Sequence, residues 1–241
     1  MVIPDAPVMP VFERIRCKLV IEPRVRWVSH LEFLRVVART VTRAALPVRY
    51  SEGFNPHLLV SFAAARPVGL SSEAEFVDLM TDGSVCAGRV QRAMNDAFPG
   101  GFCVREARQV PPEGPSLTSV INTSQYRYHL ETDRVDPLTE AIRSFLDRDE
   151  VVVLRKRHKK SDRMVDIRPH VYDVSMFCAD GGGIQLSADM ALGGQHNVRP
   201  QEFLAALASL AGPGREDLPV RIHRLDMYRL EDGNRIEPWE L

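Results

Sequence analysis

The sequence lacks a cysteine framework. Its 241 residues contain only four cysteines, and no two stand at the Cys-x2-Cys spacing that is typical of zinc and iron–sulfur sites. Cys17 and Cys103 fall in stretches where apolar residues alternate, so we expect both to be small buried hydrophobes. This usage is typical of a reducing compartment and predicts neither a metal site nor another cofactor.

Targeting and membrane signals are also missing. The opening residues, MVIPDAPVMPVF, have neither the basic region nor the long apolar core of a secretory signal. No apolar run approaches the roughly 18 residues that suggest a membrane span. Together with the cysteine usage, these absences predict a cytoplasmic protein that has no contact with membranes.

Neither an excess of one charge nor a catalytic fingerprint is present. The net charge is -1, from 31 Lys and Arg against 32 Asp and Glu, so any site for a polyanion must come from uneven charge along the chain. The GxSxG, P-loop, HExxH and Rossmann fingerprints are all absent. The sequence therefore predicts no catalytic residues and favours a protein that is not an enzyme.

What is present is a regular order of strands and helices. Residues 12–22 alternate as a strand, and Ser29 with Glu32 forms the capping box of an amphipathic helix that ends before Pro47. The pattern then predicts strands at 57–65 and 73–81, a helix at 84–97 and a strand at 102–110. This βαββαβ order is typical of the ferredoxin-like fold.

The pattern approximately repeats after a Pro/Gly-rich breaker at 111–116. We predict an α+β protein with two ferredoxin-like halves in tandem, the second less regular, because strand and turn signals at 161–190 leave its middle open. The predicted units are an N-terminal domain at 12–110, a linker at 111–120 and a C-terminal domain with a basic hairpin at 121–231.

Basic residues are concentrated in the first part of the chain. Between Arg14 and Arg66 there are ten Lys and Arg against three acids, and Arg35, Arg39 and Arg43 recur every four residues along one helix face. Like charges at this spacing repel one another by a few tenths of a kcal/mol per pair, about 0.2–0.5. The stripe is either a solvated helix face or a face whose charge repulsion is offset by an anionic partner or by acids on a neighbouring strand.

A second basic segment lies near a predicted hairpin tip. A solvated tip is the plain alternative, but the density of charge favours phosphate contact. Its basic residues are Arg155, Lys156, Arg157, His158, Lys159, Lys160 and Arg163.

The segment YSEGFNPH, residues 50–57, packs unusual residue types into one turn. We expect Gly53 to take a positive φ, Pro56 to fix the exit and Asn55 to bond backbone groups of the turn. These needs leave Phe54 and His57 unexplained, so the turn is the first candidate for a ligand-facing surface.

These motifs resemble a radical-SAM-associated domain family of unknown function, which also occurs fused behind cobalamin-binding radical SAM enzymes. The departures from the family pattern are Glu32 for Asp, Thr42 for Arg and Leu58 for Pro. The matching residues are Ser29, His30, Leu31, Arg35, Arg43, Leu46, Pro47, Ser51, Gly53, Phe54, Asn55, Pro56, His57, Ser61, Phe62, Gly69, Ser72 and Glu75.

The resemblance implies a radical SAM enzyme as partner and RNA as substrate. The chain has no Cys-x3-Cys-x2-Cys motif, so it is not itself the radical SAM catalyst. The leading hypothesis is an RNA-binding accessory protein that presents a structured RNA, rRNA or tRNA, to that enzyme. Its nucleic-acid-binding residues would be Arg26, Ser29, His30, Arg35, Arg39, Arg43, Tyr50, Ser51, Phe54, Asn55, His57, Arg168 and the basic residues of the hairpin tip.

Two alternatives stay open. The first is a protein adaptor that docks on the radical SAM enzyme without touching RNA, so that the basic stripe meets an acidic protein surface. The second is a metal-independent RNA-processing enzyme in which His30 and His57 work together, a reading that rests on fold analogy.

Overall fold

The protein is described here from a computed structural model. It describes residues 12–83, 85–132, 135–156, 161–178, 183–212 and 220–241.

The first half forms a ferredoxin-like unit. Its strands run in the order β4-β1-β3, and β2 pairs with the other edge of β3, which gives the 4-1-3-2 order of that fold. Its elements are β1 (Glu13–Ile21), α1 (His30–Arg43), β2 (Val60–Phe62), β3 (Leu70–Thr81), α2 (Ala87–Ala97) and β4 (Phe102–Val110). The predicted order is confirmed, although β2 is shorter than the predicted strand.

The second half repeats the same order with one insertion. Its strands run β10-β5-β9-β8, again 4-1-3-2, while β6 and β7 form a separate two-stranded hairpin between α4 and β8. The insertion explains why the middle of this half is irregular in sequence. The elements are β5 (Thr123–Leu130), α4 (Val135–Leu146), β6 (Val152–Arg155), β7 (Arg163–Asp166), β8 (Val171–Cys178), β9 (Ile184–Ala191), α5 (Pro200–Leu210) and β10 (Val220–Glu231).

Short elements fill the connections. The predicted linker contains the helical turn α3 (Leu117–Val120), and its two end residues are buried in a cluster with Phe76 of β3 and Met227 of β10. The others are the 3-10 turns η1 (Pro23–Val25), η2 (Arg168–His170) and η3 (Pro238–Glu240), and the strand β11 (Asn234–Ile236), which pairs with β10.

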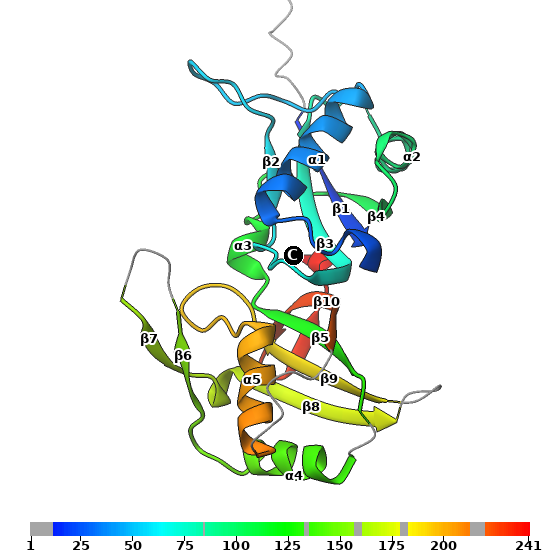
Figure 1. Cartoon of the computed structure of the whole chain (residues 1–241). Helices are drawn as coiled ribbons and strands as arrows, with labels where there is room; N and C mark the ends of the chain where they lie inside the picture. Colours follow the sequence, from blue (N-terminus) through cyan, green and yellow to red (C-terminus); the bar gives the residue numbers. More distant parts are fainter. Residues whose placement is uncertain (1–11, 84, 133–134, 157–160, 179–182, 213–219) are drawn as a thin grey trace, which may run out of the picture.

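The two halves share one nine-stranded sheet. Strand β10 runs parallel to β3, and their register partners are Ile222 with Leu70, His223 with Ser71 and Arg224 with Ser72. We call this contact the seam. Figure 1 shows β10 continuing the sheet below β3, at the junction of the two halves.

Each half has its own core. Phe33 and Val37 of α1 and Met94 of α2 pack on the first part of the sheet, whereas Phe145 of α4 and Phe203 of α5 pack on the second. Strands β5 and β10 turn apolar residues toward α4 and α5, so alternation leaves a polar face on their other side. Within the described residues, no helix is long and apolar enough to cross a membrane.

The predicted burial of the cysteines is confirmed for Cys17. This residue is fully buried, and burial raises the pKa of its thiol far above the ordinary value, with Asp78 adding to the effect. Cys103 is half-buried.

Candidate functional site

The arginine stripe of α1 is only partly free. Arg35 forms an ion pair with Glu32, and Arg43 donates to the carbonyl of Ala97 at 2.6 Å, at the end of α2. Arg39 is exposed and has no polar partner among the described residues. Local acceptors therefore offset much of the repulsion in the stripe, and the stripe by itself does not require an anionic ligand.

The other basic residues of the first segment are mostly internal. Arg16 is fully buried and binds Asp78 at 2.8 Å, and Lys18 binds Asp226 at 2.9 Å. Arg14 donates to the carbonyl of Pro115 at 3.0 Å, and Arg66 donates to main-chain carbonyls that include that of Val28. The excess of basic residues in sequence is therefore not a basic patch on the surface.

Ser29 and His30 serve the start of α1. The Ser29 side chain accepts from the backbone N–H of Glu32 at 3.3 Å, while the Glu32 carboxylate binds Arg35, so only one half of the predicted capping box forms. His30 Nδ1 accepts from the backbone N–H of Arg66 at 3.4 Å, and its ring meets the Phe62 ring edge-on. Burial lowers the pKa of His30.

The segment 50–57 is a closed loop that projects from the first half (Figure 1). Ser51 Oγ lies 2.8 Å from His57 Nδ1 and accepts from the backbone N–H of His57 at 3.1 Å. This Ser51–His57 clamp makes His57 a structural residue of the loop. Gly53 has a φ of 115°, as predicted.

The tip of this loop is open to solvent. Phe54 is 105% exposed and Tyr50 54% exposed. Asn55 forms no side-chain hydrogen bond within the described part of the chain, so the predicted Asn55 cap is replaced by the Ser51–His57 clamp. No described hydrogen bond or ring contact joins His57 to His30.

The basic residues in and just after the β6–β7 hairpin divide into two groups. Arg155 binds Glu202 of α5 at 2.7 Å, and Arg168 donates to the carbonyl of Leu146 at 3.0 Å. These contacts assign Arg155 and Arg168 to packing rather than to phosphate binding. Lys156 and Arg163 are exposed, and neither has a polar partner among the described residues. Arg157, His158, Lys159 and Lys160 lie outside the described residues.

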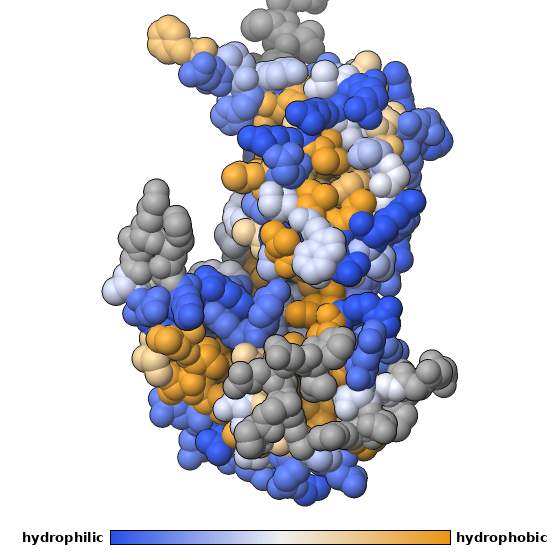
Figure 2. Space-filling view, in the orientation of Figure 1, coloured by the Kyte–Doolittle hydropathy of each residue, from blue (hydrophilic) through white to orange (hydrophobic). Residues whose placement is uncertain are grey.

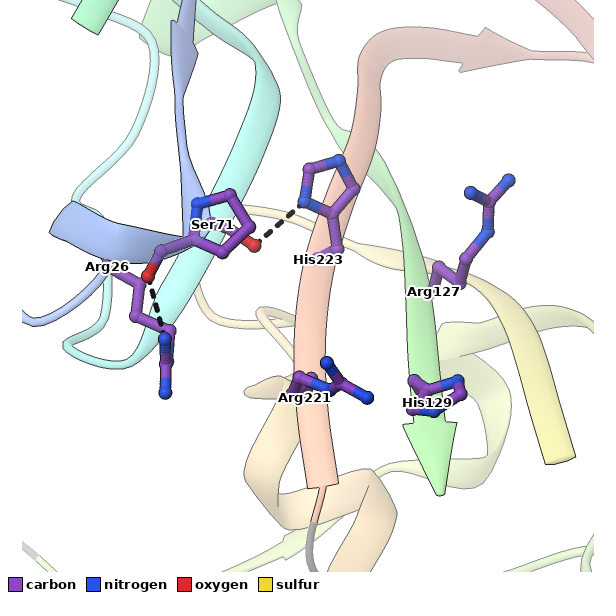
Figure 3. A pocket seen from close by; sticks show the side chains of 7 residues that line it. Arg26, Ser71, Arg127, His129, Arg221 and His223 are labelled. Atoms are coloured by element: carbon purple, nitrogen blue, oxygen red, sulfur yellow. Dashed lines mark hydrogen bonds between the residues drawn. The ribbon is translucent and has the colours of Figure 1, made fainter. Parts of the chain in front are cut away.

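A different group of basic side chains surrounds a cavity of about 310 Å³ at the seam. It lies next to Pro23 of η1, and Figure 3 shows side chains from four parts of the chain around it. We call it the seam pocket. Its other lining residues are Arg26, Ser71, Arg127, His129, Arg221 and His223.

Strand pairing fixes this arrangement. Arg127 and His129 alternate on one face of β5, and their direct partners on β10 are His223 and Arg221. His223 is also the direct partner of Ser71 on β3. The pocket is therefore part of the sheet itself, and its basic groups are spaced by the pleat rather than by a loop.

The lining contains three arginines and no acid. Arg221 has a partner outside the lining, Glu131, at 3.4 Å. Arg26 donates to the carbonyl of Pro23 at 2.7 Å, and neither Arg26 nor Arg127 has an acidic partner among the described residues. The pocket thus combines two uncompensated guanidinium groups from different halves of the chain, which suits an anion.

His223 is held between a hydroxyl and a carboxylate. Its Nδ1 lies 2.8 Å from Ser71 Oγ, and its Nε2 lies 3.2 Å from Glu73 Oε1. Because a carboxylate only accepts, Nε2 carries a proton, and the Ser71 hydroxyl donates to Nδ1 of the neutral ring. Burial lowers the pKa of His223, with Arg127 and Arg105 adding to the effect and Glu73 opposing it.

Ser71 does not have the setting of a nucleophile. It is 5% exposed and lies inside β3 as the cross-strand partner of His223. Its hydrogen bond therefore orients His223 toward the pocket. Within the described residues, no group of three or more His, Cys, Asp and Glu side chains is placed to hold a metal ion.

Of the predicted binding residues, only Arg26 lines the seam pocket. Sequence reasoning missed the residues of β5 and β10, although both strands carry the same Arg-x-His pattern. The segments are Arg127-Tyr128-His129 and Arg221-Ile222-His223. Read with the strand order of the ferredoxin-like fold, which makes these strands neighbours, the repeated pattern would have indicated the site.

Comparison with known proteins identifies a family. A family model described as "Uncharacterized protein conserved in bacteria (DUF2344)" matches residues 14–200. No curated protein matches the sequence.

Two solved structures show a weak likeness to this chain. A chain of a Cbf5–Nop10–Gar1 complex matches with 12% identity and a TM-score of 0.49, over 87% of this chain and 47% of that chain. A protein whose name reads "glycine cleavage system transcriptional repressor" matches with 11% identity and a TM-score of 0.26, over 89% of this chain and 98% of its own. Both TM-scores lie below 0.5, so neither likeness bears on function.

Proposed function

The chain belongs to this family of bacterial proteins, and we propose that it is an RNA-binding accessory protein that presents a structured RNA, rRNA or tRNA, to a radical SAM enzyme. The partner enzyme is taken from the family resemblance of the sequence. RNA binding is supported by the seam pocket.

The observation that carries the proposal is the uncompensated charge of Arg26 and Arg127. A guanidinium matches the geometry of a phosphate oxygen pair, and phosphate contacts supply most of the affinity for nucleic acid. The two arginines come from different halves of the chain and reach the same cavity, so a bound phosphate would contact both halves.

Further contacts are proposed at the projecting segments. The loop 50–57 and the hairpin β6–β7 extend toward the same side of the molecule in Figure 1, and Figure 2 shows the surface hollowed between them. Phe54 offers an exposed ring, and Lys156 and Arg163 offer free charges. We keep for Phe54 the stacking role predicted from the sequence. For Arg39, Lys156 and Arg163 we keep the predicted contact with phosphates.

The experiment compares the double variant Arg26→Gln/Arg127→Gln with the wild type in binding labelled tRNA and rRNA fragments over a range of salt concentrations. The double variant should bind more weakly, and the slope of log K against log salt should fall by about 1, for the one phosphate that both arginines contact. The control is Arg143→Gln/Arg229→Gln, since both residues form exposed ion pairs outside the pocket lining.

The outcomes separate the site from the function. An unchanged slope in the double variant would remove the seam pocket from the RNA interface. Failure of the wild type to bind any RNA would overturn the proposed function. If the radical SAM enzyme still co-purifies after nuclease treatment and the complex contains no RNA, the protein is an adaptor for that enzyme and the proposed RNA-binding function is wrong.

A further inference from the structure

A large aromatic side chain stands beside the seam pocket and is mostly open to solvent. Trp27 directly follows the pocket residue Arg26, and it is 65% exposed. The other tryptophan of the chain, Trp239, instead packs against Phe76 with a centroid distance of 5.2 Å. An indole that remains so open has contact area available for a ligand.

The position of Trp27 is nevertheless fixed. Gly69 has a φ of 86° and donates its backbone N–H to the carbonyl of Arg26 at 2.9 Å. A Cβ at Gly69 would lie 3.2 Å from Trp27 Cζ3, so the absence of a side chain allows the indole to approach the main chain. The Arg26 guanidinium lies 4.8 Å from the centre of the ring. A ring held in this way loses little freedom when a ligand stacks on it.

Two segments of the chain place the Trp27 ring next to the seam pocket. Arg26 touches the ring and also lines the pocket, and Gly69 lies two residues before the pocket residue Ser71. Val68 adds further exposed apolar surface, since it is 50% exposed. A flat apolar surface next to two guanidinium groups that have no acidic partner among the described residues matches a nucleotide, which has a flat base and an anionic phosphate.

We propose that Trp27 is the stacking platform for an unpaired base of the bound RNA, and that the seam pocket holds a phosphate of the same single-stranded segment. This inference rests on the proposed RNA binding and specifies its substrate class. A base inside a duplex is stacked on both faces, so it reaches Trp27 only after unstacking at a cost of a few kcal/mol. An unpaired base is free to stack, whatever its identity.

The test measures binding of fluorescein-labelled oligouridylate of about 12 nucleotides and of an RNA duplex of equal length, at one salt concentration. The wild type should bind the single strand more tightly than the duplex. Trp27→Ala should weaken single-strand binding by about 5- to 150-fold, the range expected for one stacked base, and leave duplex binding unchanged. Trp27→Phe should restore most of the loss, because a phenyl ring also stacks.

A second measurement uses the intrinsic fluorescence of the ring. In the Trp239→Phe variant, Trp27 is the one remaining tryptophan, and its emission should be quenched by the single strand and not by the duplex. The matched control is Phe177→Ala, which removes another exposed aromatic residue, 58% exposed, from β8. This control should bind the single strand as the wild type does.

The outcomes distinguish this inference from the function on which it rests. Equal binding of single strand and duplex by the wild type, with no effect of Trp27→Ala, would overturn the stacking site and leave RNA binding in place. The absence of binding to either RNA would overturn both. Selective loss of single-strand binding in Trp27→Ala, with loss of both RNAs in Arg26→Gln/Arg127→Gln, would support both.

Discussion

Arg224 of β10 and Glu75 of β3 form an ion pair inside the seam between the two halves. Their Nη1 and Oε1 atoms lie 2.7 Å apart, and the side chains are 1% and 3% exposed. Tyr126 of β5 accepts a second hydrogen bond from Arg224 at 3.0 Å. Burial alone would lower the pKa of Arg224, but Glu75 and Tyr126 raise it, so the guanidinium remains charged where it is buried.

Removing the carboxylate should therefore be costly. Glu75→Gln leaves the charge of Arg224 buried without its counter-ion, and we expect the free energy of unfolding to fall by about 3–5 kcal/mol. Chemical denaturation followed by circular dichroism measures the change. In the control Glu140→Gln, which breaks the exposed pair with Arg143, the loss should stay below about 1 kcal/mol. Similar losses in the two variants would contradict a stabilising role for the seam pair.

The pH dependence of RNA binding should follow His223. Its pKa lies below the ordinary 6.5 in the free protein, and a bound phosphate favours the charged ring, so binding takes up a proton. Affinity should rise as the pH falls from about 7.5 to about 5.5. The charged groups that face His223 are Glu73, Arg105 and Arg127.

Titration of RNA into the wild type and His223→Gln at several pH values measures this effect. The variant should show a flatter profile, whereas His196→Gln, which changes an exposed histidine outside the pocket lining, should behave as the wild type. The stability of the free protein changes in the opposite direction. Because the folded state holds the pKa of His223 down, its contribution to stability is present above pH 6.5 and is lost as the pH falls through the lowered pKa. A profile that is steeper in His223→Gln would contradict the assignment.

Gly69→Ala tests how Trp27 is held. The new Cβ meets Trp27 Cζ3 at 3.2 Å and forces a φ of 86° on an alanine, so we expect a loss of about 1–2 kcal/mol in the free energy of unfolding. The emission of Trp27 should shift as its ring moves. Gly88→Ala is the matched control, because this glycine lies in α2 and a Cβ there meets only ordinary contact with Arg92. An unchanged spectrum and stability in Gly69→Ala would show that Gly69 does not position the ring.

We expect the Ser51–His57 clamp, and not the exposed side chain of Phe54, to hold the loop 50–57 closed. Ser51→Ala removes the hydrogen bonds to His57 and should increase the rate of proteolysis between Tyr50 and Leu58. Phe54→Ala removes a side chain that touches solvent and should leave that rate unchanged. Both variants should keep the global free energy of unfolding within about 0.5 kcal/mol of the wild type. Faster cleavage in Phe54→Ala would show that the tip also holds the loop.

The secondary structure was largely predictable because each element has a strong local signal. The apolar alternation of residues 12–22 predicted β1, and the N-cap residue Ser29 predicted the start of α1. The division into domains at 12–110 and 121–231 stays a prediction. Two separate unfolding transitions in calorimetry would support it, and one cooperative transition would count against it.

The site was not predictable from local signals. Ser71 and His223 are 152 residues apart in sequence, and their contact depends on a parallel seam of three residue pairs. Charge counting also misled, because it cannot distinguish Arg16, buried against Asp78, from Arg127, which remains free. The basic residues of the α1 stripe and of the hairpin stand out as runs in the sequence, whereas the pocket arginines occur singly, after η1 and on the strands β5 and β10.

The parallel pairing of β10 with β3 also sets the order in which the protein gains its binding site. During synthesis, residues 12–110 are made before β10 and can build the first unit. Until β10 is made, Leu70, Ser71 and Ser72 of β3 lack the strand with which they pair at the seam. That strand contains Arg221 and His223, and in chain order only the short strand β11 of the shared sheet follows it. The seam pocket is therefore absent from every nascent or truncated chain that ends before residue 220. The seam pocket, and with it the proposed binding of RNA there, thus depends on a chain that has been made almost to its end.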